Sequence, residues 1–407
     1  RACRRATPTR ERVFLHGLWQ WQPGDDAAAA APADGWTEVP VPGPWPGGEG
    51  RPDVDAAWYQ TRIVVPEHWA GRRVALTAEF VNSFATVYLD GRKVADIRFP
   101  AGEADLTPMC RPGGEHVLSI LVRAMPLRAV MMSYNDSDAA KEVKGRVGMR
   151  GLCGDVCLEG TPRAARIDHV RVETSVRAWR LAFSTALKDV DPAATYVLRA
   201  EVRDGVETVK EVVGEPFRGA DALAGRVTFG EDWHPDKLWD MHTPGNQYEA
   251  TVSLLAADGT LLDEALPERF GFREFWIEGR DFYLNGTRVF LSFARGQRGW
   301  TYEETRRSLE QRRSVGINFV AVGGFGCLPG AHRGFDGVLR ASDDYGTVVA
   351  LTQPHFSAYD WDAPDAEQTN GYARHAEFYA RVAGNHPSVV FYAASHNGTG
   401  YAEDMNP

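Results

Sequence analysis

The chain lacks any long apolar run, although 43% of its 407 residues are hydrophobic. No stretch approaches the roughly 18 uninterrupted apolar residues that a membrane-spanning helix requires. Residues 1–10 are basic but contain no apolar core, so they do not predict a signal peptide. We therefore expect a soluble protein without a membrane partner. The compartment stays open between the cytoplasm and a secreted or periplasmic location with its signal removed.

Cysteine is scarce, and its odd number does not predict a disulfide framework. Cys153 and Cys157 are expected to share one face of a single strand, because strand side chains alternate with a period of two. A zinc site would need further soft ligands at suitable spacing, and none lie near these two. The glycine-rich run 323–330 lacks the Lys-Ser/Thr pair of a phosphate-binding loop. We expect neither a metal nor another cofactor. The five cysteines are Cys3, Cys110, Cys153, Cys157 and Cys327.

An excess of basic residues is also absent. The chain has 45 Lys and Arg against 55 Asp and Glu, which gives a net charge of −10. This balance argues against a nucleic-acid or anionic-membrane partner and favours a neutral ligand. The length is too great for one hydrophobic core and predicts several domains.

Short alternating apolar runs fill the first two thirds of the chain. In residues 12–163 they are separated by turn signals, and Asp90-Gly91 predicts a two-residue hairpin. This pattern is typical of a jelly-roll β-sandwich, which we assign to residues 1–163. Residues 164–269 contain six further runs, the number expected for an immunoglobulin-like β-sandwich.

The pattern changes after residue 270. Asn285-Gly286 predicts a hairpin turn, and short apolar runs then alternate with helical stretches. Such alternation predicts parallel strands joined by helices, and four units would form the first half of a (β/α)8 barrel over residues 270–407. An open doubly wound sheet is the alternative. The expected strands are Val289–Ala294, Ile317–Val322, Thr347–Leu351 and Ser388–Ala394, and the expected helices are Tyr302–Ser314, Gly334–Tyr345 and Gly371–Ala383.

Polar residues follow three of these expected strands. Barrel enzymes place their chemistry at the carboxyl ends of the strands, so these residues are candidates for a functional site. They are Arg295 after the first strand, Gln353 and His355 after the third, and Ser395, His396 and Asn397 after the fourth.

Several motifs, in order along essentially the whole chain, point to one family. The most specific are Phe270-Gly271-Phe272-Arg273 with Leu284-Asn285-Gly286, and His386-Pro387-Ser388-Val389-Val390 before the fourth expected strand. With these motifs the chain resembles glycoside hydrolase family 2, which contains β-galactosidases, β-glucuronidases and β-mannosidases. The resemblance implies a hydrolase of O-glycosidic bonds whose partner is a carbohydrate substrate. It also implies that the jelly roll of residues 1–163 is similar to the family's sugar-binding domain.

The chain departs from the family where the acid/base residue should stand. The family reads Trp-Ser-Leu-Gly-Asn-Glu, and residues 392–397 read Tyr-Ala-Ala-Ser-His-Asn. Asn397 therefore replaces the catalytic Glu, and an amide has no proton that it can give up near neutral pH. A histidine can titrate near pH 6.5, so His396 is the better acid/base candidate, with His355 as the second.

A retaining glycosidase also needs a carboxylate nucleophile. The resemblance puts that residue on a later strand, beyond Pro407, so the chain is expected to be truncated within the barrel.

The remaining candidates would bind the substrate. Arg295 can hold a hydroxyl or a carboxylate through two hydrogen bonds, or can serve in a structural ion pair instead. Trp300, Tyr359 and Trp361 can stack on a sugar ring. Gln353 and Ser395 are expected to add polar contacts at the same carboxyl ends of the strands.

Two alternatives to an active hydrolase remain open. One is a non-catalytic carbohydrate-binding protein with a degenerate barrel, which Asn397 favours. The other is an inactive fragment of a longer glycosidase. A half-barrel leaves strand edges unpaired, so we also expect either a homo-oligomer or association with a missing C-terminal half.

Overall fold

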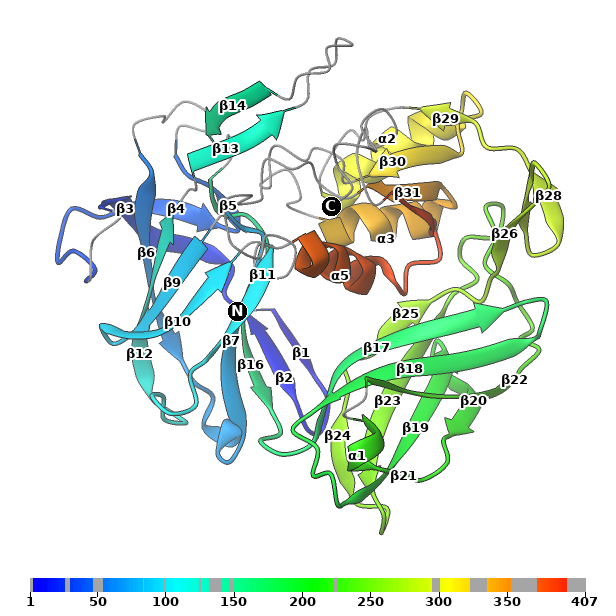
Figure 1. Cartoon of the computed structure of the whole chain (residues 1–407), viewed down its shortest axis with the longest axis horizontal. Helices are drawn as coiled ribbons and strands as arrows, with labels where there is room; N and C mark the ends of the chain where they lie inside the picture. The colour runs from blue at the N-terminus through cyan, green and yellow to red at the C-terminus, as the bar shows by residue number, and fades with distance from the viewer. Residues whose placement is uncertain are drawn as a thin grey trace.

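β-sheets make up most of the protein, and its helices of more than four residues lie in the C-terminal third of the described chain (Figure 1). The computed structural model describes residues 3–25, 30–46, 54–82, 84–98, 100–123, 126–131, 141–146, 150–222, 225–294, 301–322, 335–352 and 372–393. In this part of the chain, no helix is long and apolar enough to cross a membrane. The chain is thus multidomain and mainly β.

Two antiparallel sheets form the N-terminal sandwich, drawn in blue and cyan in Figure 1. The six-stranded sheet has the order β10 (Arg92–Arg98), β9 (Phe84–Leu89), β12 (Glu115–Arg123), β6 (Ala56–Val64), β3 (Gly17–Gly24), β4 (Thr37–Val41). The five-stranded sheet has the order β1 (Arg4–Ala6), β2 (Glu11–Phe14), β16 (Val156–Thr161), β7 (Arg73–Glu79), β11 (Ala101–Asp105).

Smaller elements complete this region. They are β5 (Gly43–Pro44), β15 (Gly151–Leu152) and β8 (Val81–Asn82) in one sheet, the hairpin β13 (Pro126–Met131) and β14 (Lys141–Arg146), and the single-turn helix η2 (Glu67–Trp69).

Alternation of side chains explains the core of this sandwich. Trp19 and Trp21 on β3 are each 3% exposed and point into the sandwich, whereas Gln20 between them is exposed. The predicted hairpin at Asp90-Gly91 is confirmed, because Leu89 pairs with Arg92 and both turn residues have positive φ, 49° and 77°. A two-residue turn with two positive φ angles matches the twist of the strands.

The second sandwich, green in Figure 1, also has two antiparallel sheets. One contains β17 (Arg166–Ser175), β18 (Arg180–Lys188) and β22 (Arg226–Asp232). The other contains β20 (Glu207–Val213), β19 (Thr195–Asp204), β23 (Tyr248–Ala256), β24 (Leu261–Glu264), β21 (Phe217–Arg218) and β25 (Glu268–Phe270). The helix α1 (Gly219–Ala222) follows β21.

A short antiparallel sheet leads into four parallel strands. The antiparallel strands are β26 (Phe275–Glu278), β27 (Asp281–Leu284) and β28 (Thr287–Val289), with the predicted turn at Asn285-Gly286 confirmed by φ angles of 52° and 87°. The parallel strands are β29 (Phe293–Ala294), β30 (Phe319–Val322), β31 (Val348–Thr352) and β32 (Val389–Ala393), and the helices are α2 (Tyr302–Arg313), α3 (Phe335–Tyr345) and α5 (Tyr372–Ala383).

The prediction of parallel strand–helix units is confirmed for these elements. Each strand pairs in parallel with the next one along the chain, in the order β29-β30-β31-β32. Val320 and Val322 belong to the same core as buried residues of α2, α3 and α5, so alternate residues of β30 face the helices. Thr301 caps α2 with its side chain, and Glu304 completes the capping box.

One expected strand is wrong. The run Val289–Ala294 was expected to form a single parallel strand, but Val289 pairs with Phe282 in the antiparallel sheet, and the parallel strand contains only Phe293 and Ala294. The run is apolar almost throughout, so its composition does not reveal where one sheet ends and the next begins. Phe290 between them is 84% exposed.

The expected shared strand of Cys153 and Cys157 is also wrong. Leu152 ends β15 and Val156 starts β16, so the chain leaves the strand geometry between the two cysteines. The backbone N–H of Gly154 donates to the Glu79 carbonyl at this bend. Both cysteines are nevertheless buried, at 1% and 3% exposure.

The three regions contact one another through specific side chains. Arg10 of the first sandwich forms an ion pair with the buried Asp263 of the second. Phe80 packs edge-on against Phe378 of α5, with ring centroids 5.3 Å apart. The Asn385 side chain, just after α5, accepts a hydrogen bond from Val172 N and donates one to Val170 O, both on β17.

Gly271 marks the tightest of these contacts. A Cβ atom at this position would lie 2.5 Å from Trp239 Cβ and 2.8 Å from Pro387 Cβ, so only glycine lets the three backbones approach. Pro387 lies directly before Ser388 and β32, and therefore the glycine sets how closely the second sandwich packs against the start of that strand.

We predict that Gly271→Ala lowers the free energy of unfolding by about 1–3 kcal/mol, because the added methyl group overpacks this contact. Thermal denaturation would measure the loss. Gly245→Ala is the matched control, since a Cβ atom there meets nothing within 4 Å. Equal melting temperatures for the two variants would contradict the packing argument.

Candidate functional site

The carboxyl ends of the four parallel strands lie at one edge of their sheet. These ends are Ala294, Val322, Thr352 and Ala393. Neighbouring strands are paired close to these ends. Ala294 pairs with Val320, Val322 pairs with Leu351, and Thr352 pairs with Ala393, so the strands finish side by side. Segments that leave neighbouring parallel strands at one edge are the ones that form a common site.

The predicted site residues belong to the segments that continue from these ends. The chain passes directly from Ala294 to Arg295 and from Thr352 to Gln353, while Ser395 follows Ala393 by two residues. The structure describes the strand ends and not the predicted residues, which therefore remain predictions. The nine residues outside the described part of the chain are Arg295, Trp300, Gln353, His355, Tyr359, Trp361, Ser395, His396 and Asn397.

The opposite end of this sheet packs on an aromatic cluster. Phe391 of β32 contacts Phe319, the first residue of β30, with ring centroids 5.6 Å apart. It also contacts Phe275 at 5.2 Å and Phe282 at 5.8 Å, both in the antiparallel sheet. These contacts pack β30 and β32 against the antiparallel sheet that precedes them.

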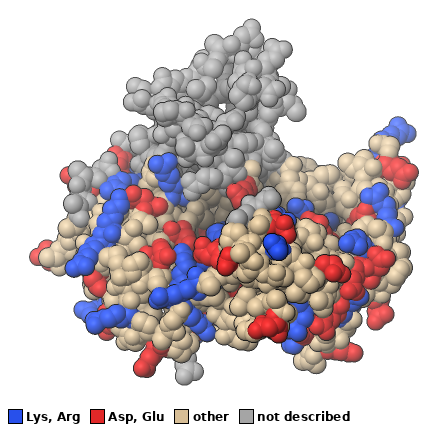
Figure 2. Space-filling model, turned by 60° about the horizontal axis from the view of Figure 1, so that its bottom comes forward, with Lys and Arg blue, Asp and Glu red and all other residues tan. Residues whose placement is uncertain are grey.

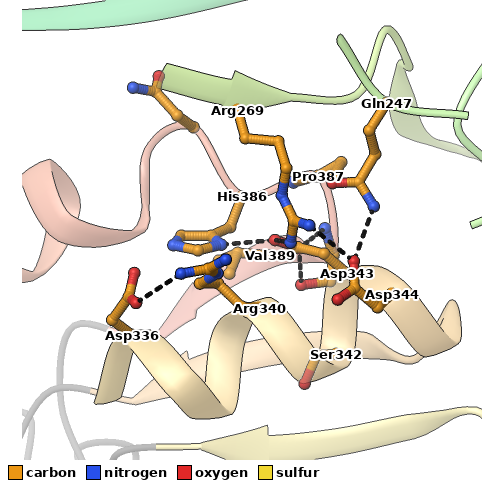
Figure 3. Close-up of polar contacts among 12 residues, drawn as sticks. Gln247, Arg269, Asp336, Arg340, Ser342, Asp343, Asp344, His386, Pro387 and Val389 are labelled. Atoms are coloured by element: carbon orange, nitrogen blue, oxygen red, sulfur yellow. Dashed lines mark hydrogen bonds and ion pairs between the residues drawn. The ribbon is translucent and has the colours of Figure 1, made fainter. Parts of the chain in front are cut away.

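A buried polar cluster lies between the C-terminal end of α3 and the start of β32 (Figure 3). Asp343 is 1% exposed, and its Oδ2 lies 2.6 Å from Nδ1 of His386. Its Oδ1 accepts hydrogen bonds from Ser388 Oγ at 2.6 Å and from Ser388 N at 3.1 Å. Both carboxylate oxygens are therefore satisfied.

These three residues contain the side chains of a serine-hydrolase triad but not its geometry. In such a triad the histidine takes the proton of the serine hydroxyl, and the aspartate orients the histidine. Here the Ser388 hydroxyl donates to Asp343 instead. The cluster also precedes β32, at the amino end of the strand. We conclude that it fixes α3 against β32 and has no nucleophile.

The cluster extends into the second sandwich. Arg269 forms an ion pair with Asp344 at 2.9 Å, and the Gln247 side chain donates to the same carboxylate at 3.2 Å (Figure 3). Trp239 Nε1 donates to the Asp343 carbonyl at 3.0 Å. These contacts hold β25 and the segment between β22 and β23 against the C-terminal end of α3.

Arg273 ties the two sequence motifs together. Its Nε donates to the Pro387 carbonyl at 3.0 Å, and its Nη2 donates to the Val389 carbonyl at 2.7 Å, across 114 residues of chain or more. The arginine that ends Phe270–Arg273 thereby holds the start of β32. The sequence showed both motifs but gave no signal that they contact each other.

The surroundings of His386 favour the protonated form of its imidazole. Burial by itself lowers the pKa of the imidazole, but the adjacent Asp343 carboxylate, with Asp336 and Glu268, outweighs that effect and raises the pKa of His386 above its usual 6.5. A raised pKa in the folded state means that the protonated form stabilises the fold. That contribution is fully present below about pH 6.5 and is lost as the pH rises through the folded-state pKa.

Surface charge does not single out a further site on the face shown in Figure 2. Lys and Arg side chains are interspersed there with Asp and Glu side chains. A phosphate backbone is bound by clustered basic residues, and the described residues form no such patch on this face. Among the described residues, no group of three His, Cys, Asp or Glu side chains is placed to hold a metal ion.

We predict that His386→Gln destabilises the protein in a pH-dependent way. At pH 6 the variant should lose about 1–3 kcal/mol, because the donor to the Asp343 carboxylate is then an uncharged amide instead of a positively charged imidazolium. The difference from the wild type should shrink as the pH rises towards 9. Denaturant unfolding at several pH values measures it, with His242→Gln at an exposed position as the control. A pH-independent difference would contradict the assigned role of the charge.

Comparison with known proteins gives relatives that include a β-glucuronidase and a putative β-glucuronidase. No protein-family model matches the chain. The chain is 22% identical over 437 residues to a β-glucuronidase of Paenibacillus borealis, covering 98% of this chain and 70% of the relative. It is 24% identical over 364 residues to a putative β-glucuronidase of Formosa agariphila, covering 84% of this chain and 40% of the relative.

Solved structures share the fold. A β-glucuronidase from Ruminococcus gnavus superposes with a TM-score of 0.73 at 18% identity, covering 98% of this chain and 69% of that one. A glycosyl hydrolase family 2 member from Bacteroides cellulosilyticus gives a TM-score of 0.68 at 17% identity, covering 94% of this chain and 52% of that one. The chain thus spans between 40% and 70% of the length of these four proteins. With sequence relatives that are β-glucuronidases and the fold of this group, the chain is glycoside hydrolase family 2-like.

Proposed function

We propose that the chain acts on the O-glycosidic bonds of a carbohydrate, as a glycoside hydrolase-like protein whose substrates are β-glucuronides. The observation that carries this proposal is the similarity to a β-glucuronidase over 98% of the chain. The four parallel strands support it, because their carboxyl ends lie at one edge and lead into the segments with the candidate polar residues. The chain spans only part of the length of its relatives. The hydrolytic activity of a full-length protein is therefore also a proposal.

The proposed architecture has three domains. Residues 1–163 would be a jelly roll, residues 164–269 an immunoglobulin-like sandwich, and residues 270–407 the first half of a (β/α)8 barrel. The order β29-β30-β31-β32 follows the chain without reversal. A doubly wound sheet reverses its strand order at a switch point, and the described strands contain none, which favours the barrel.

In the proposed reaction His396 is the acid/base residue. It would donate a proton to the oxygen of the leaving group, which an imidazole with an ordinary pKa near 6.5 can do. Asn397 would hold a sugar hydroxyl or a water through its amide. In this proposal the carboxylate nucleophile comes from a later strand of the barrel, and His355 is the second candidate for proton transfer.

The other candidates would hold the sugar. A glucuronide carries a carboxylate, and a guanidinium can bind it through two parallel hydrogen bonds, so Arg295 is the proposed carboxylate ligand. Trp300, Tyr359 and Trp361 would stack on sugar rings. Gln353 and Ser395 would contribute polar contacts at the rim.

We predict that His396→Ala abolishes the hydrolysis of 4-nitrophenyl β-D-glucuronide by an enzyme that also carries the later strands of the barrel, while the fold stays intact. Loss of a general acid typically costs at least about 100-fold in rate. Release of 4-nitrophenol measures turnover, and circular dichroism checks the fold. His242→Ala, at an exposed position in the second sandwich, is the control. An unchanged rate would remove His396 from the mechanism.

We predict the opposite effect for Asn397→Glu. A carboxyl group at this position restores the residue type that a retaining mechanism uses as its acid/base, so turnover of the same substrate should rise by about 100-fold. Asn397→Gln keeps the amide and lengthens the side chain to that of Glu, so it is the matched control and should give no gain. Equal rates for the Glu and Gln variants would show that a carboxyl group at position 397 cannot serve as the acid/base.

A carbohydrate-binding protein without turnover is the second candidate, because Asn397 stands where the family has its catalytic Glu. A glycan array with the intact chain, run beside the hydrolysis assay, separates the two. Binding without hydrolysis by the wild type would favour this candidate, or an inactive fragment of a longer glycosidase. Hydrolysis above the uncatalysed rate would exclude both.

A further inference from the structure

Helix α5 lies between the two sandwiches and contacts both of them (Figure 1). The first sandwich reaches the helix through Phe80, directly after β7, and the second through His169 of β17, whose Nε2 lies 3.2 Å from the Arg381 carbonyl oxygen. We propose that the contact of the first sandwich with α5 is a pH-sensitive switch, closed while the Glu79 carboxyl group is protonated and opened when that group ionises. The proposal goes beyond the hydrolase and does not depend on it.

The apolar part of this contact is formed by Phe80 and Cys153 of the first sandwich. They are 3% and 1% exposed and belong to the same core as buried residues of α2, α3 and α5. Phe80 has a positive φ of 46°, which is uncommon for a bulky side chain, and a Cβ atom at Gly154 would lie 2.8 Å from Phe80 Cδ2. The ring is thus held tightly by its own sandwich. Separation of the sandwich from α5 therefore exposes this core, including the Cys153 thiol.

Glu79 stands immediately before Phe80 and ends β7. Its backbone is fixed, because its N–H donates to the Asp155 carbonyl at 2.9 Å and its carbonyl accepts from Gly154 N at 3.2 Å. Its side chain is partly buried, and among the described residues no group forms a hydrogen bond or an ion pair with the carboxylate. Ionisation of a carboxyl group that is shielded from water and has no partner costs free energy. The closed contact therefore favours the neutral acid.

The charges around Glu79 do not supply a partner. Two are positive and two are negative, and they come from four different segments of the chain. Arg12 is engaged with Glu159 at 2.7 Å, and Arg381 lies 4.0 Å from Asp168. The four charges are Arg12 of β2, Asp155 before β16, Asp336 of α3 and Arg381 of α5, and the neighbouring titratable groups are the Cys157 thiol of β16 and His16, 3.0 Å from Asp155.

Burial, assisted by the Asp155 carboxylate, raises the pKa of Glu79 from 4.5 to about 7. Arg12 and Arg381 act on this pKa in the opposite direction and do not cancel the effect. A pKa that is raised in the closed contact means that the protonated form stabilises the contact. That contribution is complete below about pH 4.5 and is lost as the pH rises through about 7. The switch therefore operates in the neutral range of pH.

The second sandwich meets the same helices near two groups that respond to protons in the same direction. Burial raises the pKa of Glu268 on β25, whose carboxylate accepts a hydrogen bond from Asn385 at 3.3 Å. Burial lowers the pKa of His386, but the neighbouring carboxylates raise it above its usual value. The Asp336 carboxylate of α3 acts on Glu79, Glu268 and His386 alike and raises the pKa of each. Protons thus favour the assembled arrangement of all three regions.

Labelling of Cys153 with N-ethylmaleimide measures the opening, because its thiol is buried in the contact and is not part of a disulfide. The 407-residue chain is labelled without denaturant at pH 6 and at pH 8, and mass spectrometry of its peptides gives the rate at Cys153. Division by the rate in the denatured chain at the same pH removes the intrinsic effect of pH on the thiol. We expect the corrected rate to be about tenfold higher at pH 8, as pKa values of Glu79 of about 7 in the closed contact and 4.5 in the open one require.

Two outcomes of this measurement would overturn the proposal. One is a corrected rate at Cys153 that is the same at both pH values. The other is a rise that is accompanied by loss of the circular dichroism signal, because the whole chain and not this contact would then be opening.

Variants assign the rise to Glu79. Glu79→Gln keeps the size of the side chain and cannot ionise, so Cys153 should be labelled equally slowly at both pH values. Asp155→Asn removes a carboxylate that raises the pKa of Glu79, so it should reduce the rise. Glu38→Gln is the matched control, because Glu38 is exposed on β4 of the other sheet, and this variant should keep the wild-type rise.

A rise in Glu79→Gln equal to that of the wild type would exclude Glu79 as the switch. The labelling uses no substrate, so its result stands whether or not the chain hydrolyses a glycoside. Loss of the rise in Glu79→Gln by a chain without any turnover would refute the hydrolase and leave the switch supported.

Discussion

The contact between Arg273 and the start of β32 determines how the parallel strands sit on the rest of the molecule. A guanidinium surrounded by protein must have its donors satisfied, and two of them bind the carbonyls of Pro387 and Val389. Gly271 allows the close approach, because a side chain there would collide with Trp239 and Pro387. The two motifs that carry the resemblance to the family are therefore two halves of one contact.

This contact acts on the end of the strand opposite to the candidate site. The polar cluster around Asp343 fixes α3 to the same amino end, while the aromatic rings of Phe319 and Phe391 fill the space beside it. With the amino ends held, the carboxyl ends at Val322, Thr352 and Ala393 are set in register by the ladder. A parallel sheet built in this way separates the residues that stabilise it from the residues that can react.

The sequence alone predicted the elements better than the contacts between them. Strand–helix alternation and the hairpins at Asp90-Gly91 and Asn285-Gly286 are local, so composition and turn chemistry reveal them. The end of the antiparallel sheet at Val289 could not be predicted, because the apolar run continues past it. The bend between Cys153 and Cys157 depends on a backbone hydrogen bond to Glu79, 75 or so positions away along the chain, which no local pattern contains. The Asp343 cluster was missed for the same reason.

The candidate site residues were selected because they follow the carboxyl ends of strands. The types of side chain found there then limit which step of a reaction each one could perform. An amide at residue 397 can hold a proton donor in place but cannot be one, so any acid catalysis has to come from a neighbouring group that titrates. His396 is such a group one residue away, but consecutive residues rarely present their side chains to the same point. An active enzyme of this sequence therefore requires the backbone after Ala393 to turn, so that the imidazole and not the amide reaches the leaving oxygen. A protein that only binds glycans has no such requirement, because the amide by itself is sufficient to recognise a hydroxyl group.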